Sequence, residues 1–139
     1  MNDRCAAGAG RFLEMMARAL GYEISEFGAG ALEGREGVRL NSMCAVFAES
    51  EVVSLMTRGE RREDIARAVH QAIARRSGAM LARVSAEPPV VFAGGAARNP
   101  CLARMLEEAL GRPLLVPDDP QMVGALGAAL LAGGLQSEW

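Results

Sequence analysis

Three cysteines are the residues of this chain with the widest range of possible chemistry: Cys5, Cys44 and Cys101. Their odd number and wide spacing do not fit the disulfide framework of a small secreted protein. A cysteine in a reducing compartment is a buried apolar residue, a nucleophile or a metal ligand. Cys5 and Cys44 each precede a segment with helical spacing, and a helix N-terminus lowers the pKa of a nearby thiol. From the residues alone all three cysteines stay open between these roles, and a buried apolar residue is the commonest of them for a free cysteine.

A glycine pair forms the second feature of interest. Gly94 and Gly95 follow a short apolar run and precede a helical pattern. Glycine allows the backbone to lie flat against a ligand, so this turn is a candidate binding element. Asn99, a few residues later, has a structural interpretation as the N-cap of a helix with Pro100 at its first position.

The single histidine does not point to a catalytic triad or dyad. His70 comes directly after Val69, which is predicted to face the core, so we expect the histidine at the flank of its helix. One histidine without a supporting motif assembles neither a Ser/His/Asp nor a Cys/His arrangement.

The overall composition excludes several classes of protein. The length of 139 residues fits one domain, and the net charge of −2 gives no basic footprint for nucleic acid. No apolar run approaches the roughly 18 residues of a membrane span, and the N-terminus lacks a signal pattern. We therefore expect a cytoplasmic protein without nucleic-acid or membrane partners. The aromatic content of 4% implies a core of Ala, Leu, Val, Ile and Met.

Apolar spacing predicts how the secondary structure is arranged. Short apolar runs at 90–93 and 114–116 are typical of buried strands, and 38–40 is a possible third strand. Their alternation with helices in the last third favours a parallel α/β layer. Two strands are too few for a stable sheet, so strands before Met1 are expected to be missing. Helices are predicted over 8–20, 46–56, 62–84, 99–110 and 122–132, with a weak pattern over 22–36. The pattern over 62–84 is the most regular, with an apolar stripe along one face made of Ile65, Val69, Ile73, Met80 and Val84.

Several motifs together resemble the activator ATPases of the 2-hydroxyglutaryl-CoA dehydratase and benzoyl-CoA reductase systems, the BadF/BadG/BcrA/BcrD family. They are MNDRCAAGAGRFLE at 1–14, CAVFAESEVV at 44–53, FAGGAARN at 92–99 and GALGAAL at 124–130. The resemblance implies an α/β fold, the helix-rich second lobe of the two-lobed ATPases that include actin, Hsp70 and sugar kinases (the ribonuclease H-like fold). Residues 1–139 would form this C-terminal, cluster- and adenosine-binding lobe as a single domain. The first lobe and its phosphate-binding turn would be absent.

The resemblance also implies the cofactors. In this family a homodimer holds one [4Fe–4S] cluster at its interface, which assigns Cys5 and Cys44 as metal ligands. The alternative for this pair is two buried, unmodified thiols. Cys101 lies outside the family's ligand motif and is predicted to be a packing residue. A cluster normally takes four thiolates, and a two-fold dimer supplies them as two identical pairs. ATP or ADP with Mg²⁺ would bind between the lobes, with Gly94, Gly95 and Asn99 at the nucleotide. For Asn99 the N-cap interpretation stays open beside this one.

The implied function is ATP-dependent electron transfer in anaerobic metabolism. Such an activator delivers low-potential electrons to a dehydratase or reductase that acts on a CoA thioester. The alternative is a non-catalytic dimerisation or partner-binding domain left from such an ATPase, and a further one is a lobe of a sugar-kinase-like phosphotransferase. With half of the cleft missing, the isolated chain is expected to lack full ATPase activity. The family likeness places Gly124 and Gly127 near the interlobe hinge, and tight helix packing explains them equally well.

Overall fold

The computed structural model describes residues 8–40, 45–84 and 87–134, without the side chains of residues 45 and 46. The predicted helices and the last two strands are all present, within a few residues of their expected bounds. The 38–40 segment is not a strand, so that prediction was wrong. The elements are α1 (Ala9–Ala19), α2 (Ile24–Leu32), α3 (Ala45–Thr57), α4 (Arg62–Arg83), β1 (Val90–Val91), the 3₁₀ turn η1 (Gly95–Arg98), α5 (Pro100–Leu110), β2 (Leu114–Leu115) and α6 (Val123–Ala132).

Helix α5 shows why these boundaries could be predicted. The Asn99 side chain accepts a hydrogen bond from the Leu102 backbone N–H at 2.9 Å, and Pro100 occupies the first helical position. Gly111 ends the helix in the left-handed conformation, with φ of 64°. Each of these residues satisfies or omits a backbone group that a helix terminus leaves unpaired.

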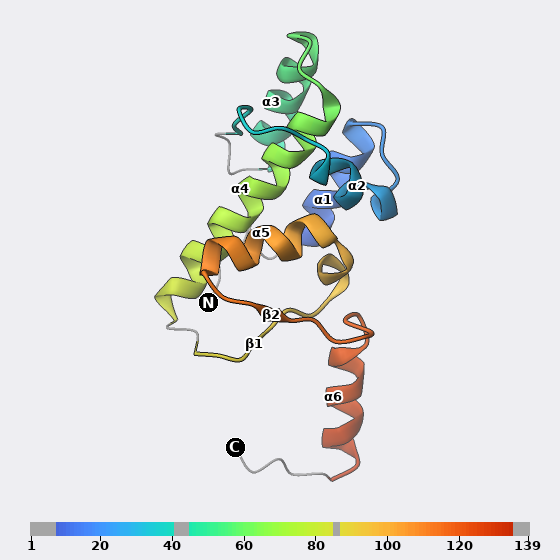
Figure 1. Ribbon diagram of the computed structural model, residues 1–139. Coiled ribbons are helices and arrows are strands. Elements are labelled where there is room, and N and C mark those ends of the chain that lie inside the picture. The colour runs from blue at the N-terminus through green and yellow to red at the C-terminus, as the bar shows by residue number, and fades with distance from the viewer. Residues whose placement is uncertain (1–7, 41–44, 85–86, 135–139) are drawn as a thin grey trace.

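Helix α4 is the central element of the fold. It contacts α1, α2, α3 and α5, and Figure 1 shows it running between α3 and α5. Its predicted apolar stripe is buried at Ile65, Val69 and Ile73. The stripe continues to Val84, which is exposed, so burial is confined to the part of the helix that its neighbours cover. The core therefore lies among the helices, to one side of the sheet.

The sheet of the described residues consists of β1 and β2. They pair in parallel, with Val90 opposite Leu114 and Val91 opposite Leu115, which confirms the predicted α/β layer. The prediction that both strands are fully buried was wrong, because Val91 is 53% and Leu115 54% exposed. Successive side chains of a strand point to opposite faces. The helices partly cover the face that carries Val90 and Leu114, and no described layer covers the other face.

Helix α6 stands apart from the rest of the described fold. It packs against none of the other described helices or strands, as Figure 1 shows, and none of its residues is buried. A Cβ atom added at Gly124 or Gly127 would meet nothing within 4 Å, so tight packing against described residues does not explain these glycines. Although α6 is apolar, none of the described helices combines the length and hydropathy needed to cross a membrane.

Candidate functional site

The glycine turn, residues 94–98 between β1 and α5, has a conformation that requires glycine at its first position. Gly94 adopts φ of 93° and ψ of 175°, a region that other residues rarely enter. Its N–H donates to the carbonyl of Pro120 at 2.7 Å. A Cβ atom at this position would meet nothing within 4 Å, so the space in front of Gly94 is open. The turn thus presents bare backbone to an open region, as a ligand-binding turn does.

A second segment, residues 116–122, lies beside this turn. It follows β2, just as the turn follows β1, and the carboxyl ends of parallel strands meet at one edge where ligands commonly bind. A Cβ atom at Gly95 would lie 3.0 Å from Nε2 of Gln121, so the Gln121 side chain reaches the backbone of the turn. Sequence analysis did not select Gln121 or the buried Pro120. Their position after the second parallel strand is the signal that could have identified them.

An ion pair adds a further link between the two segments. Arg98 of η1 donates to the Asp119 carboxylate at 2.9 Å, and both side chains are exposed. Exposed pairs contribute little to stability. The backbone hydrogen bond from Gly94 is therefore the stronger constraint on the turn.

Asn99 directly follows the turn, and both the oxygen and the nitrogen of its side-chain amide form hydrogen bonds. Its Oδ1 caps α5, which confirms the N-cap prediction, and its Nδ2 donates to Nε2 of His70 at 2.9 Å. A contact between Asn99 and a nucleotide stays a prediction, and with the side chain engaged it would involve the backbone. His70 is completely buried, so the prediction of a flank position was wrong. The reason is that α4 is covered by α2 and α5, which encloses more than one face of the helix.

The two predicted cluster ligands, Cys5 and Cys44, lie outside the described residues. What the structure describes is the helices that follow them. Helix α3 begins directly after Cys44, and α1 begins four residues after Cys5. These helices pack against each other, and a hollow of about 210 Å³ between them is lined by α1 residues and by Glu49 of α3. Within the described segments, no group of three or more His, Cys, Asp or Glu side chains could hold a metal ion.

Cys101 has the surroundings of a packing residue, as predicted. It is completely buried in α5, with its Sγ 3.9 Å from Sδ of Met105. Burial raises the pKa of the Cys101 thiol to about 11, so it stays protonated at neutral pH. A protonated thiol is a poor metal ligand.

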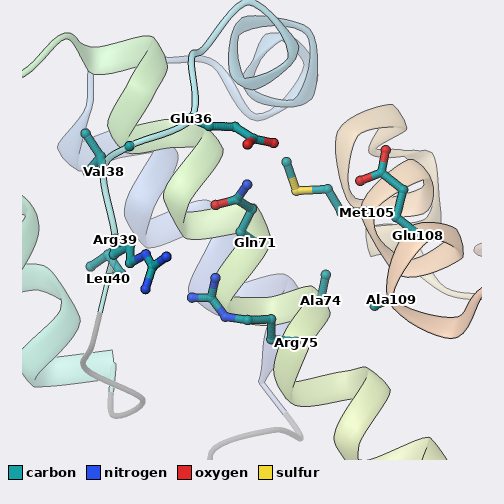
Figure 2. Close-up of a pocket in the computed structure, with 11 residues that line it drawn as sticks. Glu36, Val38, Arg39, Leu40, Gln71, Ala74, Arg75, Met105, Glu108 and Ala109 are labelled. Atoms are coloured by element: carbon teal, nitrogen blue, oxygen red, sulfur yellow. The ribbon is translucent and has the colours of Figure 1, made fainter.

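A groove of about 760 Å³ lies between residues 36–40, α4 and α5, and Figure 2 shows its lining side chains. Arg39 and Arg75 extend into it and point toward one another. Its two carboxylates, Glu36 and Glu108, each pair with an arginine that does not line the groove. The glycine turn does not line it either, so groove and turn are separate features. Surface arginines form no recognisable sequence pattern, which is why the groove was not predicted.

Comparison with known proteins assigns the family. The model of the BadF/BadG/BcrA/BcrD ATPase family matches residues 1–132. The chain belongs to this family. The 2-hydroxyisocaproyl-CoA dehydratase activator of Clostridioides difficile is 42% identical over 132 residues, which cover 95% of this chain and 50% of that protein. The (R)-2-hydroxyglutaryl-CoA dehydratase activating ATPase of Acidaminococcus fermentans is 41% identical over 95% of this chain and 51% of that protein.

The structural comparison agrees with the family assignment. The solved activator of the 2-hydroxyisocaproyl-CoA dehydratase from Clostridium difficile, with bound ADPNP, superposes with a TM-score of 0.89 at 40% identity. The match covers 96% of this chain and 50% of that one. The predicted fold, a helix-rich α/β lobe of the actin-like ATPases, is thereby confirmed. The chain spans about half the length of the relatives it matches, and it corresponds to their C-terminal half.

Replacing Gly94 by alanine tests the conformation of the turn. An alanine side chain has open space here, yet its backbone disfavours φ of 93°. We expect a loss of unfolding free energy of about 1–3 kcal/mol, measured by urea denaturation. Gly95→Ala is the matched control, because Gly95 lies in η1 without a positive φ and its new methyl group would meet only the movable Gln121 side chain. Equal losses in both variants would contradict the conformational argument.

Proposed function

We propose that residues 1–139 form the cluster- and adenosine-binding lobe of an ATP-dependent electron-transfer activator. Two copies would form a homodimer around one [4Fe–4S] cluster, bound by Cys5 and Cys44 of each copy. The partner enzyme would be a 2-hydroxyacyl-CoA dehydratase or a benzoyl-CoA reductase. The observation that carries the proposal is the family match over residues 1–132, which includes both cysteines and the glycine turn.

The geometry of the turn supports the nucleotide part of this proposal. Gly94 and Gly95 offer bare backbone beside open space, and residues 116–122 form a second wall of the same edge. ATP or ADP would lie against this edge with its adenosine, while Mg²⁺ would bind mainly through the phosphates. The other lobe, outside these residues, would complete the phosphate contacts.

The packing of the helices suggests how nucleotide state could reach the cluster. The turn leads into α5, α5 packs on α4, and α4 packs on α3, the helix that begins directly after Cys44. ATP and ADP can bias such an arrangement only through contacts that differ between the two states. The bound cluster would supply the low-potential electron, and the helices would change its surroundings.

Anaerobic reconstitution of the full chain with iron and sulfide tests the proposal. We expect a dimer with about two irons per chain, because four thiolates from two copies hold one four-iron cluster. Iron analysis and native mass spectrometry measure both quantities. Calorimetry should show ADP binding, while ATP hydrolysis by this chain alone should stay at background.

Two results would contradict the proposal in different ways. Folded chain without iron after reconstitution would remove the electron-transfer role. A stable dimer that binds neither iron nor ADP would support the alternative, a dimerisation or partner-binding domain.

A further inference from the structure

Two buried polar side chains meet behind the glycine turn. His70 of α4 is 0% exposed and Asn99, at the start of α5, is 8% exposed. The Nδ1 atom of His70 lies 2.7 Å from the Ala66 carbonyl, and its Nε2 lies 2.9 Å from Nδ2 of Asn99. Because a carbonyl can only accept, Nδ1 carries the proton and Nε2 accepts from the Asn99 amide. One neutral tautomer therefore satisfies every hydrogen bond of the pair.

Neighbouring groups hold this pair in place. The ring of Phe27 in α2 packs on the His70 ring, with centroids 4.7 Å apart. The next residue, Gly28, lies so close that an added Cβ atom would be 2.6 Å from Oδ1 of Asn99. The Asn99 side chain is therefore confined between α2 and α4. Burial also lowers the pKa of His70, which favours the neutral ring that can accept a hydrogen bond.

The confined residue, Asn99, also directly follows the Gly94–Arg98 turn and is hydrogen-bonded to it. The Asn99 N–H donates to the Ala96 carbonyl at 3.1 Å, and the Ala97 N–H donates to the Gly94 carbonyl at the same distance. The other end of the turn is held by the hydrogen bond from Gly94 to Pro120. Fixing Asn99 thus fixes the second end of a turn whose first end is already held.

Capping α5 does not by itself require His70. The cap uses Oδ1 of Asn99, whereas the amide nitrogen, buried with it, needs an acceptor of its own. A buried donor without a partner is strongly unfavourable, so without His70 the amide would turn toward another acceptor and carry the turn with it.

We propose that His70 is a positioning residue for the nucleotide: through Asn99 it fixes the backbone of the Gly94–Arg98 turn, without touching the ligand itself. The inference rests on the proposed function for its ligand. The part that concerns the turn stands on the described contacts alone.

Two substitutions at His70 separate hydrogen bonding from packing. His70→Gln keeps an acceptor, since the amide oxygen of glutamine can reach the place of Nε2, and His70→Leu fills the space without one. We expect His70→Leu to speed amide hydrogen exchange at residues 94–99 in the full chain and to weaken ADP binding about tenfold. His70→Gln should restore most of both. Equal exchange rates in the two variants would overturn the proposal, even if both melt at a lower temperature.

Asn99→Ser provides an independent test that leaves the histidine in place. A serine hydroxyl can cap α5, yet it is too short to donate to His70. We expect the same faster exchange at 94–99, and no further increase when His70→Leu is added, because both changes remove one interaction. Unchanged exchange in Asn99→Ser would overturn the proposal. If the unmodified chain binds no ADP, the proposed function fails, while the exchange comparison still decides whether His70 holds the turn.

Discussion

Replacing Cys5 or Cys44 by serine is expected to abolish iron binding, the largest functional effect that any single substitution in this chain should have. Each change removes two of the four thiolates from a symmetric dimer, and a [4Fe–4S] cluster normally needs all four. Iron analysis and visible absorption after anaerobic reconstitution measure the loss. The dimer mass, measured on the same samples, shows whether the cluster is also needed for association.

Cys101→Ala is the matched control for these cysteine variants. Its thiol is buried in α5 and stays protonated, so its removal should leave the iron content unchanged. The alanine leaves only a small cavity, and the chain should still fold. If Cys101→Ala lost iron while either serine variant kept it, the assignment of the ligands would be wrong. If all three variants kept the iron, the cluster would not be bound by the proposed cysteines.

The helices were predictable because their determinants are local. The stripe of α4 and the Asn99, Pro100 and Gly111 boundaries of α5 act within a few residues of where they stand in the sequence. The burial of the strands, in contrast, does not depend on the local sequence. An apolar run such as that at Val91 is the same whether or not a second layer covers it, and here the described residues supply none.

Helix α2 shows a different limit of sequence analysis. Its pattern over 22–36 is weak, since Gly28 and Gly30 lower helix propensity and interrupt the apolar spacing. The structure explains both residues. Gly28 lets α2 approach Asn99, and Gly30 leaves room for the Tyr22 ring. Tertiary packing therefore uses the very residues that make the helix hard to predict.

In the candidate site, too, some features could be predicted from the local sequence and others could not. The glycine turn and the N-cap role of Asn99 follow from residue types along one stretch of chain. The acceptor for the Asn99 amide comes from His70, 29 residues earlier, and no spacing rule joins the two. The cluster ligands were identified from family motifs and lie outside the described residues, so they stay a prediction.

The second large effect is expected in the core, where Phe27→Ala should lower the unfolding free energy by about 3–5 kcal/mol. Phe27 is completely buried, and its ring packs on Tyr22 and His70, with centroids 5.6 and 4.7 Å apart. Removing it leaves a cavity that the helical backbones cannot easily fill. For a domain stabilised by about 5–15 kcal/mol, this is a large fraction of the total, and urea denaturation measures it.

Phe47→Ala is the same substitution at an exposed position and separates burial from residue type. Phe47 lies in α3 and is 67% exposed, so its loss should change the unfolding free energy by no more than about 0.5 kcal/mol. Similar losses in the two variants would contradict the assignment of Phe27 to the core.

Because Phe27 also supports the ring of His70, its loss should speed hydrogen exchange at residues 94–99, an effect that Phe47→Ala should not share. The core contact and the glycine turn would then respond to one change, as their connection through His70 and Asn99 requires.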